Sequence, residues 1–170
     1  KLAEWAKDKS IRAVVVFGAG DKAFCAGGEV RALYEAGKAG NRALLRDFFW
    51  HEYRMNYRIA TYPKTLIAVM DGLVMGGGAG IGLNAPVRVA TERAIFSMPE
   101  CSIGLYPDVG AGHFLQRCPG EIGVFLALTG LRLRTAGLSY CGLVTDTIPS
   151  DKVADLTPDV FGLCFAVVVV

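Results

Sequence analysis

The sequence predicts an α/β fold, and three observations carry this prediction. Two apolar, strand-like runs at 11–17 and 66–70 are separated by segments with helical periodicity. Glycine-rich stretches follow both runs, as loops do where buried strands end. The 170 residues are 52% hydrophobic and 20% charged, which is a globular composition and excludes a disordered chain. We therefore expect one core and one site.

The individual elements follow from periodicity and from helix-ending signals. In the first half we expect helices at 1–9, 30–36 and 41–60 and strands at 11–17 and 66–70. The long helix ends where Tyr62 and Pro63 disfavour helical backbone. In the second half we expect strands at 87–90, 94–97 and 143–147, a loop at 99–112, and helices at 114–118, 121–129 and 135–140. The sequence contains no internal repeat.

The long predicted helix carries a row of large apolar residues beside one acid. The apolar residues are Phe48, Phe49, Tyr53, Met55 and Tyr57. Such a row predicts a stripe that faces the core. Glu52 has two readings that the sequence leaves open: an ordinary exposed acid, or a polar group that reaches into a ligand cavity.

Two glycine-rich loops are the strongest local features. The first, FCAGGE at 24–29, stands directly before a helix, and its small residues leave backbone N–H groups uncovered. Gly28 is the expected donor. The second, MGGGAG at 75–80, follows a buried strand. A tight turn and close helix packing are the alternative readings, but two such loops together meet the needs of a backbone oxyanion hole.

Nucleotide, nucleic-acid and membrane binding are disfavoured. The segment GIGLNA at 80–85 fits a dinucleotide fingerprint, yet Pro86 interrupts the helix that this motif requires. The net charge is +2 and no basic stripe alternates with aromatic residues, so no nucleic-acid partner is expected. The apolar tail at 160–170 is shorter than the roughly 20 residues of a spanning helix.

A carboxylate pair stands in a proline-anchored loop. Glu100 follows Met98 and Pro99, and Asp108 comes eight residues later, after Pro107. If the loop is buried, at least one pKa of the pair rises, and the two acids suit a general base or nucleophile with its polar partner. The alternative is a pair of solvated loop acids. No serine-hydrolase elbow, zinc-protease helix or P-loop motif occurs.

Metal sites and disulfides are not expected. The two histidines, His51 and His113, do not stand at ligand spacing with other donors, so no metal is predicted. The five cysteines form no C-x-x-C pair and are far apart, which favours reduced thiols.

The two ends suggest a domain at 1–155 and a separate tail at 156–170. The chain opens at Lys1 without Met, so we expect it to begin inside a fold. The tail contains a β-prone apolar run that would promote aggregation if exposed. We expect that it either pairs with a strand or is not native to the domain.

Several motifs, in the same order along the chain, resemble the crotonase (enoyl-CoA hydratase/isomerase) superfamily. They are FCAGGEVRALYEAGK, FFWHEYRMNYRIATYPK, DGLVMGGGAGIG, ATERAIFSMPECSIGLYPDVG and FLALTGLRL. Within the superfamily they are most similar to the branch that hydrolyses a CoA thioester in valine breakdown. The resemblance spans 11–152. It implies a crotonase-type (ClpP/crotonase) ββα spiral, here incomplete at both ends.

The resemblance implies roles for the glycines of the two loops. In the family, the thioester carbonyl lies between two backbone N–H groups, which correspond here to Gly28 and Gly77. Ala26 corresponds to a position along the adenine end of CoA. Hydratases place a second catalytic acid two residues beyond the triple glycine, and this position is Gly80 here.

The resemblance also implies roles for three acids. The hydrolase pattern has catalytic acids at Glu100 and Asp108, and a substrate-binding helix acid at Glu52. The substrate implied is an acyl-CoA, with no separate cofactor, in mitochondria or alternatively peroxisomes; a homo-oligomer stays open. Two other functions stay open: an enoyl-CoA hydratase or isomerase, and a non-catalytic structural relative such as a mitochondrial ribosome subunit.

Overall fold

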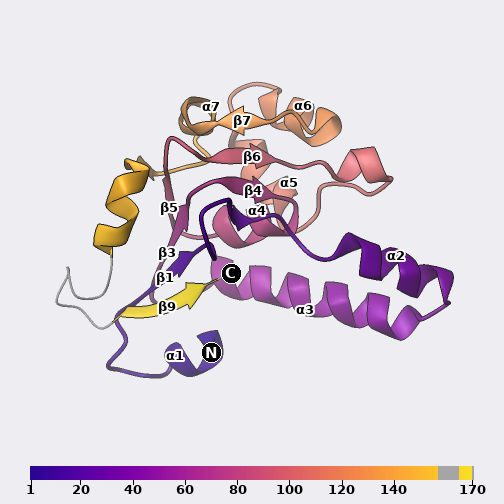
Figure 1. The fold of residues 1–170 in the computed structure, drawn as a ribbon, viewed down its shortest axis with the longest axis horizontal. Coiled ribbons are helices and arrows are strands. Elements are labelled where there is room, and N and C mark those ends of the chain that lie inside the picture. Colours follow the sequence, from indigo (N-terminus) through magenta and orange to yellow (C-terminus); the bar gives the residue numbers. More distant parts are fainter. Residues whose placement is uncertain (157–164, 170) are drawn as a thin grey trace.

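Two sheets organise the chain in the computed structural model, which describes residues 1–156 and 165–169 (Figure 1). The strands are β1 (Ala13–Phe17), β2 (Ala23–Cys25), β3 (Thr65–Met70), β4 (Leu73–Met75), β5 (Val87–Ala90), β6 (Ile95–Ser97), β7 (Leu133–Arg134), β8 (Asp146–Thr147) and β9 (Phe165–Val169). One sheet has the order β8-β5-β3-β1-β9 and the other the order β2-β4-β6-β7. All pairs are parallel except β6 with β7.

Helices connect and cover these strands. The α-helices are α1 (Leu2–Trp5), α2 (Val30–Lys38), α3 (Arg42–Ala60), α4 (Gly77–Gly82), α5 (Ala111–Phe114), α6 (Ile122–Thr129) and α7 (Thr135–Tyr140). The 3-10 helices are η1 (Glu100–Ile103), η2 (Leu115–Arg117) and η3 (Ser150–Leu156). Figure 1 shows α2 and α3 side by side, projecting from one side of the sheets as an arm.

The connections repeat a ββα unit. The chain passes through β1, β2 and α2, then β3, β4 and α4, then β5, β6 and η1. Each unit adds one strand to each sheet. Parallel neighbours need such crossovers, because a tight hairpin joins only antiparallel strands. The predicted α/β class is confirmed, and loops that follow successive strands of one sheet come together at one edge.

The core lies around β1 and β3 and extends between the sheets. Val14, Leu66 and Met70 are completely buried, as are Phe96 of β6 and, nearly, Phe24 of β2. Strands covered on both faces are continuously apolar, which explains the uninterrupted runs seen in the sequence. The 3-10 and α segments after β6 complete the far side of the core.

The predicted core stripe on the long helix is wrong. Tyr57 is 72% and Tyr53 39% exposed, whereas Asn56 and Ile59 are the buried residues of α3. The cause is the orientation of α3: Ile59 faces the core cluster, whereas Tyr53 and Tyr57 stand on other faces of the same half of the helix. The N-terminal half belongs to the arm, where aromatic residues line cavities instead of the core.

The apolar tail pairs with a strand over the part that is described. β9 lies parallel to β1 in a five-residue register from Ala13 with Phe165 to Phe17 with Val169. The expectation of pairing is confirmed for this segment, and the rest of the tail, 157–164 and 170, lies outside the described residues. In the part of the chain covered by the structure, no helix is long and apolar enough to cross a membrane.

Candidate active site

One cavity is lined by all six residues that the hydrolase resemblance assigns to catalysis or substrate binding. It has a volume of about 140 Å³. Its lining includes Ala26, Gly28, Glu52, Gly77, Glu100 and Asp108. These residues come from the loop after β2, from α3, α4 and η1, and from the segment before α5.

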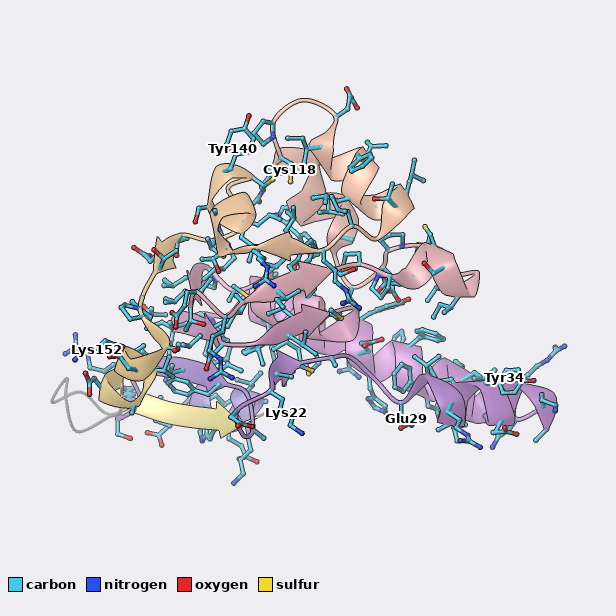
Figure 2. The ribbon with its side chains drawn as sticks, turned by 45° about the horizontal axis from the view of Figure 1, so that its top comes forward. Lys22, Glu29, Tyr34, Cys118, Tyr140 and Lys152 are labelled. Atoms are coloured by element: carbon cyan, nitrogen blue, oxygen red, sulfur yellow. The ribbon has the colours of Figure 1, made fainter. Side chains whose placement is uncertain are left out.

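The first glycine loop bends directly after β2 and is fixed at the start of α2. Gly27 has a φ of +96°, which favours glycine. The side chain of Glu29 accepts a hydrogen bond of 3.1 Å from the Arg31 N–H and caps α2. In Figure 2, Glu29 lies where the arm joins the sheets. A Cβ on Gly28 would lie 2.5 Å from Phe48 Cζ, so the loop lies tightly against α3.

The second glycine loop packs against the first and against two carboxyl groups. Gly78 has no room for a side chain, because a Cβ would collide with the Cys25 carbonyl. A Cβ on Gly77 would collide with Glu52 Oε1, and one on Gly76 would lie 3.0 Å from Glu100 Oε1. Close packing, the alternative reading from sequence, therefore explains Gly78. The other two glycines leave their backbone beside carboxyl groups of the cavity.

The backbones of the two loops are in contact. A Cβ on Gly27 would lie 3.2 Å from the Gly77 nitrogen. Gly28 follows at once, and both Gly28 and Gly77 line the same cavity. The structure thus brings together the two loops that the sequence singled out, although Gly28 and Gly77 are 49 positions apart in the chain.

Three carboxyl groups share this small cavity. Glu100 is only 5% exposed, and its Oε2 has no hydrogen-bond partner among the described residues. Burial, together with the charge of Asp108, raises the pKa of Glu100. Burial and the charges of Asp108 and Glu100 raise the pKa of Glu52 to about 7. Close carboxylates disfavour one another's ionisation, so Glu52 and Glu100 hold their protons to a higher pH than exposed glutamates do.

Asp108 is held by a residue that the sequence analysis placed in the core stripe. The Tyr53 hydroxyl donates a 2.7 Å hydrogen bond to Asp108 Oδ2. Burial, and then the hydrogen bond and charge of Asp108, raise the pKa of Tyr53. The two residues are 55 positions apart, and no local signal in the sequence connects them.

The position of the second hydratase acid is closed. A Cβ on Gly80 would lie 2.5 Å from Val109 Cβ and 3.0 Å from Asn56 Oδ1. A glutamate at this position would therefore require Val109 to move. The cavity has Glu100 but no second acid from α4.

A larger cavity of about 660 Å³ adjoins the first. The two share Gly27, Gly28, Phe48, Glu52 and Gly77 in their walls. The larger one continues along α3 and to Cys25 and Ile81 and is mostly apolar. Together they offer a long ligand a route past the carboxyl groups. Within residues 1–156 and 165–169, no three His, Cys, Asp or Glu side chains gather to hold a metal ion.

Comparison with known proteins places the chain in a family. The family model described as enoyl-CoA hydratase/isomerase matches residues 1–163. The mitochondrial 3-hydroxyisobutyryl-CoA hydrolase of Danio rerio is 48% identical over 163 residues, which are 96% of this chain and 42% of that protein. Small ribosomal subunit protein mS47 of Neurospora crassa is 41% identical over 93% of this chain and 33% of its own length.

A solved structure agrees in fold. An enoyl-CoA hydratase from Rhodobacter sphaeroides superposes with a TM-score of 0.90 and 43% identity over 95% of this chain and 48% of its own. The predicted crotonase-type fold is thereby confirmed. The chain spans less than half the length of each of these relatives. By its motifs, fold and family-model match, the chain belongs to the enoyl-CoA hydratase/isomerase (crotonase) family.

Proposed function

We propose that the chain carries the catalytic site of an acyl-CoA thioester hydrolase whose substrate is 3-hydroxyisobutyryl-CoA. The observation that carries the proposal is the joint placement of Glu100 and Asp108 in one cavity with Gly28 and Gly77. The names of similar proteins support it, because relatives at 45–48% identity are 3-hydroxyisobutyryl-CoA hydrolases. Their names also support a mitochondrial location, which we propose for this protein in preference to peroxisomes.

The mechanism begins with the thioester carbonyl. Its oxygen lies between the N–H groups of Gly28 and Gly77, and each donor is worth about 3 kcal/mol to the developing oxyanion. Glu100, as the carboxylate, attacks the carbonyl carbon or removes a proton from a water that attacks it. The tetrahedral intermediate then expels the CoA thiolate, which takes up a proton. On the first route this leaves an acyl-Glu100 anhydride that a water hydrolyses; on the second the free acid forms directly. One water is consumed overall, and the products are the free acid and CoA.

Burial suits Glu100 to this work. A carboxylate whose pKa is raised accepts a proton more readily near neutral pH than an exposed one. Asp108, held by Tyr53, orients the substrate hydroxyl or Glu100. Glu52 binds substrate at the wall shared by the two cavities, and Ala26 lies along the adenine end of CoA. CoA is part of the substrate, and no other cofactor is required.

Hydration of an enoyl-CoA is the second candidate, because similar solved structures carry that name. Hydratases of this family use two acids, and the position of the second is Gly80, where Val109 and Asn56 occupy the space. We therefore place hydration below hydrolysis. Turnover of crotonyl-CoA would reverse this order.

A non-catalytic role is the third candidate, since mS47 is a ribosomal protein at 41% identity. A structural subunit has no need of Glu100 and Asp108, and both are present in the cavity. This favours an enzyme. Stoichiometric association with mitochondrial ribosomes, without thioesterase activity, would favour the structural role. A homo-oligomer is proposed as the assembly, with neither nucleic acid nor a membrane as partner.

The direct test is release of free thiol from 3-hydroxyisobutyryl-CoA by the full chain. We expect turnover by the wild-type protein and a loss of about 1,000-fold or more in kcat for Glu100→Gln, which keeps the side chain's shape but not its basicity. The exposed acid Glu35 provides the control, because Glu35→Gln makes the same chemical change on the arm. Equal activity of Glu100→Gln and wild type would refute the proposal.

A further inference from the structure

The side chain of Asn84 joins α4 to the loop that carries Asp108. Its Nδ2 donates one hydrogen bond of 2.8 Å to the Gly80 carbonyl and another of 2.8 Å to the Val109 carbonyl. Gly80 is one turn before Asn84, whereas Val109 is 25 positions away. Both acceptors are carbonyls, so the amide nitrogen, and not the amide oxygen, must face them.

The loop that Asn84 holds has an unfavourable backbone conformation. Val109 has a φ of +43° and is the one residue other than glycine with a positive φ in the described part of the chain. A β-branched residue in this region is strained and persists only where its surroundings fix it. The next residue, Gly110, has a φ of +94°, and a Cβ there would lie 2.7 Å from Asn84 Oδ1.

This conformation determines where Asp108 points. The Ala111 N–H donates a 2.7 Å hydrogen bond to the Asp108 carbonyl and closes the turn. The Asp108 carboxyl group then meets the Tyr53 hydroxyl and lines the cavity with Glu100. A relaxed Val109 would rotate the peptide that follows Asp108 and turn its side chain away from both.

We propose that Asn84 is a positioning residue: its two hydrogen bonds hold the Val109 backbone, and through it the Asp108 carboxyl group, against the helix that begins at Gly77. The inference rests on the proposed function, because Asp108 serves the thioester site there. Asn84 itself does not line the cavity, so it acts through Asp108. Asparagine suits the role because its Nδ2 carries two N–H groups, one for each of the two carbonyls.

A double-mutant cycle tests this role. Asn84→Asp keeps the shape of the side chain but, as a carboxylate, offers no donor and repels both carbonyls. We expect it to lower the kcat for thioester hydrolysis by about 10- to 100-fold, the loss that a misplacement of about 1 Å produces, with KM changed less than about twofold. If Asn84 acts through Asp108, Asn84→Asp lowers kcat no further in an Asp108→Asn background.

The control makes the same chemical change elsewhere. Asn41 caps α3 by accepting a 3.1 Å hydrogen bond from the Leu44 N–H, and aspartate serves equally well as such an acceptor. We expect Asn41→Asp to keep the wild-type kcat. If Asn84→Asp lowers kcat by the same factor in the wild-type and Asp108→Asn backgrounds, Asn84 has a general structural role and the proposal is overturned.

A second measurement does not depend on activity. Hydrogen exchange of the Ala111 amide reports the turn from Asp108 to Ala111, because this N–H is bonded to the Asp108 carbonyl. We expect exchange at least about tenfold faster in Asn84→Asp and unchanged in Asn41→Asp. Unchanged exchange in Asn84→Asp would refute the positioning role. Absence of thioesterase activity in the wild type, with faster exchange in Asn84→Asp, would instead refute the proposed function and leave the positioning of Asp108 supported.

Discussion

The carboxyl group of Glu52 lies at the wall between two cavities, against the backbone of Gly77. Burial and two neighbouring acids make its charged form unfavourable. A buried carboxylate such as this lowers the free energy of unfolding, and such destabilising groups are common in active sites. Because the destabilisation comes from the ionised form, it grows as the pH rises.

Replacing Glu52 by glutamine should stabilise the protein at alkaline pH. The folded-state pKa of Glu52 is raised from its usual 4.5 to about 7. Its favourable contribution to stability is therefore complete below pH 4.5 and is lost as the pH rises through 7. We expect Glu52→Gln to unfold about 2–4 °C above wild type at pH 8, roughly 1 kcal/mol, and to lose this advantage at pH 4.5.

Thermal unfolding followed by circular dichroism at both pH values measures this difference. Glu35→Gln, an exposed substitution on α2, provides the baseline. A gain for Glu52→Gln that is the same at pH 4.5 and pH 8 would show that ionisation is not its cause.

Residues of the site divide into those that sequence could predict and those that it could not. Glu100 and Asp108 were predictable because prolines and glycines mark their loop as fixed, and the resemblance assigns their roles. Tyr53 and Asn84 were missed because their partners lie 55 and 25 positions away. The neighbours of Tyr53 and Asn84 in the sequence give no indication of these distant partners.

At the scale of elements, α4 is unusual because four of its six residues are glycines. Each glycine in a helix is destabilising by about 0.5–1 kcal/mol relative to alanine. Packing offsets this penalty: a Cβ on Gly78 would collide with the backbone of β2, and one on Gly82 would lie 2.7 Å from Met70 Sδ. Glycine thus lets α4 pack closely against β2 and β3, and this packing holds the two glycine loops together.

Gly78→Ala should therefore destabilise the protein strongly. The added methyl group meets the Cys25 carbonyl, and the backbone of β2 cannot rotate away as a side chain does. We expect a loss of about 3 kcal/mol or more in the free energy of unfolding, measured by urea denaturation. The matched substitution is Gly112→Ala on α5, where a Cβ meets nothing within 4 Å.

Alanine at Gly112 should leave stability unchanged or raise it by about 0.5–1 kcal/mol, because it restricts the unfolded chain. Equal stability of Gly78→Ala and Gly112→Ala would contradict the view that α4 and β2 are in forced contact.

Element prediction succeeded where a segment is long enough to show a period. The helices at α2, α3 and α7 and the strands at β3 and β5 lie close to the expected ranges. The strands β2, β4 and β7 were not expected, because they are short and lie beside glycine-rich loops or between predicted helices. The helix α4 was also hidden, since glycines favour loops unless tertiary contacts override them.

At the scale of the molecule, the ββα units build two sheets, and the β1 edge of one of them is covered by β9. An unpaired edge strand is a template for association with other chains. Pairing of β9 with β1 satisfies the backbone groups of that edge.

Disruption of β9 should increase self-association. β9 is the edge strand of its sheet, and Val167 lies opposite Val15 in the middle of its pairing with β1. Val167→Pro removes a backbone N–H and fixes φ at about −65°, away from the extended strand value, so it should weaken this pairing. We expect light scattering at 37 °C to rise faster than in wild type. Val167→Thr keeps the N–H and the strand preference, so it should behave as wild type. Equal scattering by the two variants would mean that β9 does not protect this edge.

The central claim is that two backbone amides from separate loops hold one thioester oxygen beside a carboxylate. The most direct measurement is a crystal structure with a CoA ketone, in which a methylene group replaces the thioester sulfur and prevents hydrolysis. The account predicts a carbonyl oxygen within about 3.1 Å of the nitrogens of both Gly28 and Gly77, with the Glu100 carboxylate facing the carbonyl carbon. A bound ketone whose oxygen touches neither amide, or from which Glu100 points away, would contradict it.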